Sequence, residues 1–282
     1  MRIIVVLVLT LTVRAAEPDV NALVRKALSS EISRQQRLEN YTWEQKTVEK
    51  TFDQKGRPQS TKTKVFEYLV IDGSEYERMI EEDGKPLNAA RVIKEQQKMD
   101  KEMARRRAES PAQRKHRQDE HSKRRQEGIK FREEVLAAFT FSIAGEEKVK
   151  GLECWKILGE PKRGYQAQSR QGKMVLGKIH GTLWITKANS DLMKVDAVTT
   201  DKITFGGFLA SLSPGAHIAL EMMRVNDELW HPELIRVSVN ARALVKRFNV
   251  EEEVAFRNFR KFKTESKLVA EEPRPAGSGP AR

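Results

Sequence analysis

Polar and apolar residues alternate along most of this chain with the two-residue period of strands that bury one face. The clearest case is Glu233–Leu244, where Ile, Val and Ala at every second position alternate with Arg, Ser and Asn. The pattern predicts roughly ten strands, at Tyr41–Phe52, Thr61–Ile71, Tyr76–Glu81, Cys154–Leu158, Gly181–Thr186, Leu192–Asp201, Ile203–Leu209, His217–Val225, Glu233–Leu244 and Val250–Phe262. Because the strands do not alternate with helices, we expect a mainly β (α+β) protein built on an antiparallel sheet.

Two segments have the three- to four-residue period of helices instead. Val20–Leu38 carries one apolar stripe and is expected to pack on a larger surface. Residues 88–138 form a helical insert dense in Lys, Arg, Glu and Gln, broken at Ser110-Pro111, where the serine caps the second helix and the proline begins it. The thin apolar stripe of this insert predicts that most of it is exposed to solvent. Apolar residues return over Ile129–Phe141, which predicts a short helix that docks on the sheet.

The first residues have the layout of a cleavable secretory signal. Arg2 precedes an apolar run from Ile3 to Leu9, and small residues follow at Ala15 and Ala16. The run is shorter than the roughly 20 apolar residues that a membrane-spanning helix needs. We therefore expect residues 1–16 to be removed by cleavage after Ala15 or Ala16, and the protein to act in the periplasm.

The remaining chain is expected to form a single domain over residues 17–263, followed by a disordered tail rich in Pro, Gly and Ser at 264–282. The formal net charge is +12, of which Arg2 and Arg14 leave with the signal. A strongly basic protein favours anionic partners. Export disfavours nucleic acid among them, so phospholipid headgroups, lipopolysaccharide and acidic glycans are the expected classes.

Residue types used in catalysis are present without the spacing that known sites require. None of the five histidines has metal-ligand spacing, and there is no nucleophile elbow, phosphate loop or dinucleotide-binding glycine motif. The single cysteine, Cys154, lies in a strand-like run and is interpreted as a small core residue. We therefore predict a protein that is not an enzyme and has no metal and no cofactor, unless distant residues assemble a site.

Several short motifs resemble those of the outer-membrane lipoprotein-sorting superfamily, which includes the periplasmic lipoprotein carrier and related envelope-stress regulators. They are Tyr41-Thr42-Trp43, the turn Gly145–Gly151, the strand Gly181–Thr186 with its Leu183-Trp184-Ile185 core, and Lys194-Val195-Asp196. The resemblance covers the chain from about Val20 to Phe262. It implies a strongly curved antiparallel sheet, an incomplete β-barrel with helices in its mouth and a concave apolar inner face. The long charged insert departs from this pattern, because a carrier's lid should be amphipathic.

The resemblance also implies a non-enzymatic periplasmic binding or carrier protein for a lipid or a lipoprotein acyl chain. Eight residues are candidates for the lining of its cavity: Trp43, Phe66, Tyr68, Trp184, Phe205, Phe208, Met222 and Trp230. The alternative is that these side chains form the packed core, because buried aromatic residues dominate protein cores.

Two basic runs in the insert are candidates for contact with an anionic membrane surface: Arg105-Arg106-Arg107 and Lys123-Arg124-Arg125. The alternative is a solvated helix face whose charge is balanced by neighbouring Glu and Asp. A second hypothesis for function follows from the same segment: an envelope protein-interaction or stress-sensing module that binds its partner through the charged helices.

Overall fold

The computed structural model describes residues 18–38, 40–53, 55–71, 74–205, 210–243 and 246–262. The predicted signal at 1–16, the predicted tail at 264–282 and Phe208 lie outside these residues.

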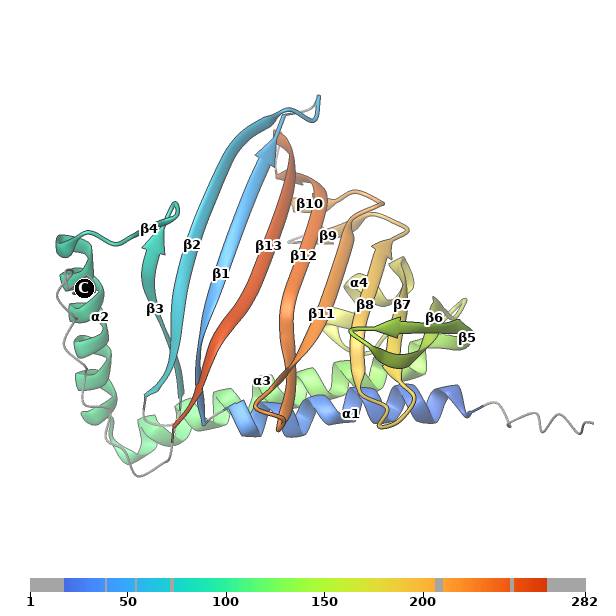
Figure 1. The fold of residues 1–282 in the computed structure, drawn as a ribbon, viewed down its shortest axis with the longest axis horizontal. Coiled ribbons are helices and arrows are strands. Elements are labelled where there is room, and N and C mark those ends of the chain that lie inside the picture. Colours follow the sequence, from blue (N-terminus) through green and yellow to red (C-terminus); the bar gives the residue numbers. More distant parts are fainter. Residues whose placement is uncertain are drawn as a thin grey trace, which may run out of the picture.

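Thirteen strands of the described residues form one antiparallel sheet in the order β4-β3-β2-β1-β13-β12-β11-β8-β7-β6-β5, and β10 joins β9 to β12. The bounds are β1 Tyr41–Phe52, β2 Pro58–Ile71, β3 Ser74–Glu82, β4 Lys85–Pro86, β5 Phe139–Val149, β6 Leu152–Pro161, β7 Ile179–Thr186, β8 Leu192–Thr199, β9 Ile203–Phe205, β10 Ala210–Leu212, β11 His217–Val225, β12 Leu229–Ala243 and β13 Lys246–Lys261. The sheet is long and strongly curved (Figure 1), and among the described residues β4 and β5 are its separate edges. The predicted mainly β class and the open, curved antiparallel sheet are confirmed.

Strand register gives the sheet one apolar face and one polar face. A row of directly paired residues crosses six neighbouring strands and is entirely apolar: Val254, Ile235, Leu220, Val195, Leu183 and Ile157. The adjacent row, one residue along each strand, is Glu253, Arg236, Ala219, Asp196 and Thr182. Because successive side chains of a strand point to opposite sides, these rows define the two faces.

Helices cover one part of the apolar face. Helix α1 (Val20–Leu38) and helix α3 (Pro111–Ala138) run side by side across one end of the strands (Figure 1). With the short helix α4 (Arg170–Val175) and a 3-10 turn (Leu176–Lys178), they enclose the largest core cluster, whose buried members are Val24, Ala27, Ala138, Phe139, Phe141, Ile157, Leu176, Ile185 and Leu192. The core therefore lies over β5–β8, between the sheet and these helices.

Helix α2 (Ala89–Arg107) stands at the other side of the molecule, against β3 (Figure 1). Its predicted junction with α3 is confirmed: Ser110 caps α3, and Pro111 is the first helical residue. No helix in the described ranges is long and apolar enough to cross a membrane.

The structure corrects three expectations about elements. Residues 129–138 are helical and pack on the core as predicted, but they are the last turns of α3 and not a separate short helix, and β5 begins at Phe139. Phe139 and Phe141 alternate with exposed Thr140 and Ser142 along this strand, so their period is two and not four. Strands β4, β5 and β10 and helix α4 were not predicted, and three of these four are too short to show a period.

Candidate functional site

Part of the apolar face is not covered by the core helices. Where β11, β12 and β13 lie side by side, seven aliphatic side chains share this face, and we call them the apolar strip: Ile218, Leu220, Ile235, Val237, Val239, Val250 and Val254. One carboxylate, that of Glu252, lies among them opposite Val237. Ile218 is 38% exposed and the other six are half-buried. None of the seven belongs to a core cluster within the described part of the chain. The strip is therefore an apolar surface open to a ligand or partner.

The strip continues into an aromatic cluster at the α1 end of the sheet. Phe256 is two residues from Val254 on β13 and packs against the cluster that contains Trp43. The Trp43 ring stacks on Tyr68, with ring centroids 5.2 Å apart, and lies 6.2 Å from the ring of Phe259. Burial and the nearby Glu77 carboxylate raise the pKa of Tyr68 to about 12, so this phenol stays neutral.

A buried donor in this cluster has no partner. Trp43 is 6% exposed, and its indole N–H makes no hydrogen bond within the described residues. Leaving such a group unpaired costs roughly 1–3 kcal/mol. The indole N–H is thus a buried donor whose partner would have to be a buried water or a polar atom that enters the cluster.

The eight predicted lining residues fall into separate groups. Trp43, Phe66 and Tyr68 share the apolar face, because Trp43 pairs with Tyr68 and Phe66 is two residues away on β2. Trp184 and Trp230 belong instead to a cluster with Cys154 and Met193. There the Trp184 indole N–H donates to Glu147 at 2.9 Å, and the ammonium groups of Lys156 and Lys194 lie over its ring.

Register places Trp184 opposite Lys194 and next to Leu183, so its ring is on the polar face of the sheet. Met222 is 1% exposed in β11, and Phe205 is the last residue of β9. The strip was not predicted from the sequence, although the alternating pattern of Glu233–Leu244 contains Ile235 and Val239. His231 was not predicted either; it is 4% exposed and contacts the rings of Phe256 and Phe259.

The polar face is hollowed across five strands by a cavity of about 400 Å³. Part of its charge is paired: Arg236 bridges Glu221 at 3.0 Å and Glu253 at 3.1 Å, and His217 Nε2 lies 2.8 Å from Asp196. No group of three or more His, Cys, Asp or Glu side chains in the described ranges is placed to hold a metal ion. The cavity is best explained as a solvated hollow lined by charged side chains.

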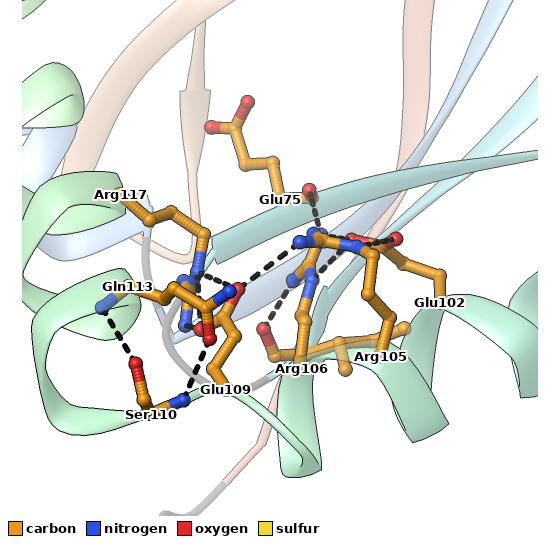
Figure 2. Close-up of polar contacts among 9 residues, drawn as sticks. Glu75, Glu102, Arg105, Arg106, Glu109, Ser110, Gln113 and Arg117 are labelled. Atoms are coloured by element: carbon orange, nitrogen blue, oxygen red, sulfur yellow. Dashed lines mark hydrogen bonds and ion pairs between the residues drawn. The ribbon is translucent and has the colours of Figure 1, made fainter.

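The junction of α2 and α3, residues 102–117, is a rigid corner that we call the elbow (Figure 2). Arg106 is only 7% exposed, and its guanidinium donates to the carbonyl oxygens of Ile71 at 2.5 Å and Glu75 at 3.3 Å. It also donates to Glu102 at 2.6 Å. Arg106 therefore ties α2 to the ends of strands β2 and β3.

Glu109 completes the elbow between the two helices. Its carboxylate accepts from Arg117 on α3, at 3.0–3.1 Å, and from Arg105 on α2, at 3.2 Å. The hydrogen bond from Arg117 lowers the pKa of Glu109, and the hydrogen bonds from Arg105 and Arg106 lower that of Glu102 to about 2. Both carboxyl groups are consequently ionised at neutral pH, which holds the corner together.

The two predicted basic runs therefore differ in their surroundings. Arg105 and Arg106 are bound to carboxylates within the elbow, while Arg107 is exposed. Lys123 and Arg124 are exposed and Arg125 is half-buried, and none of these three has a carboxylate partner among the described residues.

A second buried carboxylate fixes the other end of α3. Glu134 is 8% exposed and accepts hydrogen bonds from the Ser169 hydroxyl and from the backbone N–H groups of Gln168 and Ser169. Ser169 in turn caps α4 by accepting from the Gly172 N–H at 2.8 Å. These hydrogen bonds lower the pKa of Glu134. α3 is thus anchored at the elbow and again at α4.

Comparison with known proteins gives likenesses in structure but not in sequence. No family model and no curated protein sequence matches the chain. The structure is similar to a domain assigned to outer-membrane lipoprotein sorting from Vibrio parahaemolyticus, at 12% identity and TM-score 0.34 over 87% of this chain and 95% of that one.

It is also similar to a DUF1329 family protein from Desulfovibrio piger, at 11% identity and TM-score 0.33, and to a LolA superfamily protein from Nitrosomonas europaea, at 6% identity and TM-score 0.28. Each covers 88% of this chain and 95% of the other.

Proposed function

We propose that the protein is a non-enzymatic carrier that binds a lipid or a lipoprotein acyl chain on the apolar strip. The observation that supports this most directly is the uncovered apolar face of β11–β13, which continues through Phe256 to the buried ring of Trp43. Soluble proteins seldom expose a contiguous apolar surface without a use for it. An extended hydrocarbon chain is the ligand that a row of aliphatic side chains along paired strands accommodates.

The energetics of acyl transfer favour such a surface. Moving a hydrocarbon chain from a bilayer into water costs about 0.8 kcal/mol per methylene, so about 12 kcal/mol for sixteen carbons. Binding to a strip of Ile, Leu and Val side chains offsets part of this cost, because it removes the hydrocarbon of the ligand from water. The aliphatic side chains give little chemical selectivity, so such a carrier would select its ligand by chain length and by the polar group at the chain's end.

The open architecture is compatible with loading and release. Helix α1 lies against β12 and β1, so it borders the strip, and the core under α3 and α4 lies farther along the same face. A ligand on the strip would therefore be bounded on the α1 side and accessible on the other. The unpaired indole N–H of Trp43 would meet a carboxyl or ester oxygen at the end of the acyl chain.

The test compares two substitutions at aliphatic residues of nearly equal exposure that lie on opposite faces of the sheet. Ile218→Glu places a carboxylate in the strip, and Leu158→Glu places one on the polar face of β6, at a residue 37% exposed against 38% for Ile218. We expect the wild-type protein and Leu158→Glu to bind a fluorescent fatty acid, and Ile218→Glu to lose that binding. Equal binding by the two variants would contradict a ligand on the strip.

Native mass spectrometry of protein purified from the cell envelope supplies the second measurement. A carrier should retain lipid in a defined stoichiometry, and organic extraction should release it. Protein that carries no lipid and takes none up from vesicles would refute the proposal.

A further inference from the structure

The N-terminal part of α3 is an exposed helix that belongs to no core cluster. Every described side chain from Pro111 to Glu127 is exposed, apart from the half-buried Arg117 and Arg125. At 1.5 Å per residue this is a rod about 25 Å long. It is held at one end by the elbow and at the other by the contact of Glu134 with Ser169. A solvated rod fixed at both ends presents its surface in a constant position.

Apart from Arg117, which binds Glu109, the Lys and Arg side chains of this part of α3 have no carboxylate partner among the described residues, whereas four of the seven on α2 have one. Six basic residues between Pro111 and Lys130 have no carboxylate partner among the described residues: Arg114, Lys115, Lys123, Arg124, Arg125 and Lys130. Only three acidic residues, Asp119, Glu120 and Glu127, lie in the same span. On α2, by contrast, Arg91, Lys98, Arg105 and Arg106 each have a carboxylate partner. The rod therefore carries a net positive charge that nothing within the described fold neutralises.

The free lysines gather on one side of the helix. Lys115, Lys123 and Lys130 are eight and seven residues apart, and at 100° per residue these spacings place them within an arc of about 80°. Asp119 lies in the same arc. No large hydrophobic side chain on α3 is exposed within the described residues. This side thus offers positive charge without an apolar anchor.

We propose that this side of α3 docks the protein on an anionic phospholipid bilayer. A protein partner would need apolar or aromatic anchors at the centre of its interface, and α3 exposes none. Attraction to headgroups needs only cations within reach of a charged plane, which a straight, fixed helix with an arc of lysines provides. The contact is peripheral, because no exposed apolar residue of α3 could enter the hydrocarbon.

The experiment measures binding of the full-length mature protein to vesicles by co-sedimentation. Vesicles of phosphatidylcholine alone are compared with vesicles that also contain phosphatidylglycerol. The test variant is Lys115→Gln, Lys123→Gln, Lys130→Gln. The control is Lys62→Gln, Lys64→Gln, Lys85→Gln, which removes the same charge from three lysines that are also exposed and unpaired but lie on β2 and β4.

Wild-type protein should bind the anionic vesicles only, and added salt should weaken the binding. With each cation near the surface contributing about 1 kcal/mol, the α3 variant should bind roughly 100-fold more weakly, while the control keeps most of its affinity. Asp119→Asn should strengthen binding, and circular dichroism should show that all variants fold.

Three results would overturn the proposal: binding to neutral vesicles, equal loss in the two triple variants, or tighter binding of heparin or an acidic protein than of anionic vesicles through the same lysines. Each can be told apart from failure of the carrier function, because fatty-acid binding is assayed without vesicles.

Discussion

Replacement of Arg106 by alanine tests whether the elbow is part of the cooperative fold. The substitution removes the donor for the buried carbonyl oxygen of Ile71 and for the partly buried oxygens of Glu75 and Glu102. An unsatisfied buried acceptor costs about 1–3 kcal/mol, and the free carboxylate adds to this. Allowing for water at the two partly buried oxygens, we expect the free energy of unfolding to fall by about 3 kcal/mol.

The adjacent residue supplies the control. Arg105 is 56% exposed and also bonds Glu102 and Glu109, so Arg105→Ala should cost less than about 1 kcal/mol. Urea denaturation gives both free energies, and hydrogen exchange shows whether the amides of α2 lose protection before those of β2. Equal losses of unfolding free energy in Arg106→Ala and Arg105→Ala would show that the burial of Arg106 does not determine its contribution to stability. A loss confined to α2 would show that α2 opens independently of the sheet.

Three further predictions concern other groups. Because the pKa values of both elbow carboxyl groups are lowered in the folded protein, their stabilisation is complete above the usual carboxyl pKa and is lost as pH falls toward about 2; spin-label distances between α2 and α3 should broaden in that range and stay unchanged above it. A Cβ at Gly172 would overlap the carboxylate of Glu134, so Gly172→Ala should lower stability by about 1–3 kcal/mol, whereas Gly177→Ala, which meets open space, should not. Burial raises the pKa of the Cys154 thiol, so alkylating reagents should modify it only in the unfolded protein; rapid modification at neutral pH would contradict its assignment to the core.

Local patterns in the sequence predicted the elements well where each pattern is self-contained. The first strand was predicted with its observed bounds, Tyr41–Phe52, and the elbow was placed at Ser110-Pro111 because capping chemistry needs only neighbouring residues. The elbow network itself depends on distant partners. Arg106 meets the carbonyl of Ile71, 35 positions earlier in the chain, and no local signal indicates that one of three consecutive arginines is buried.

The candidate site was harder to predict because it depends on register. Alternation shows that a strand has two faces, but the sequence does not say which face of one strand adjoins which face of another. Trp43 and Trp184 therefore appeared equivalent in the sequence, although pairing places them on opposite faces of the sheet. The lining residues were predicted mainly from large aromatic side chains. The aliphatic Ile218 and Leu220 of β11 were therefore not among them.

The pairing of β1 with β13 has a consequence for how the chain folds. Within the described ranges, strands β1–β4 are hydrogen-bonded to the rest of the sheet only through this ladder, which joins Tyr41 to Lys261 and Phe52 to Asn249. The two partners lie about 200 positions apart, so the ladder can form only after almost the whole described chain has been delivered. Until then, the first hairpins carry two unpaired edges. A chaperone that binds unpaired strands would act before the β1–β13 ladder forms. Truncation within β13 would separate β1–β4 from the rest of the sheet.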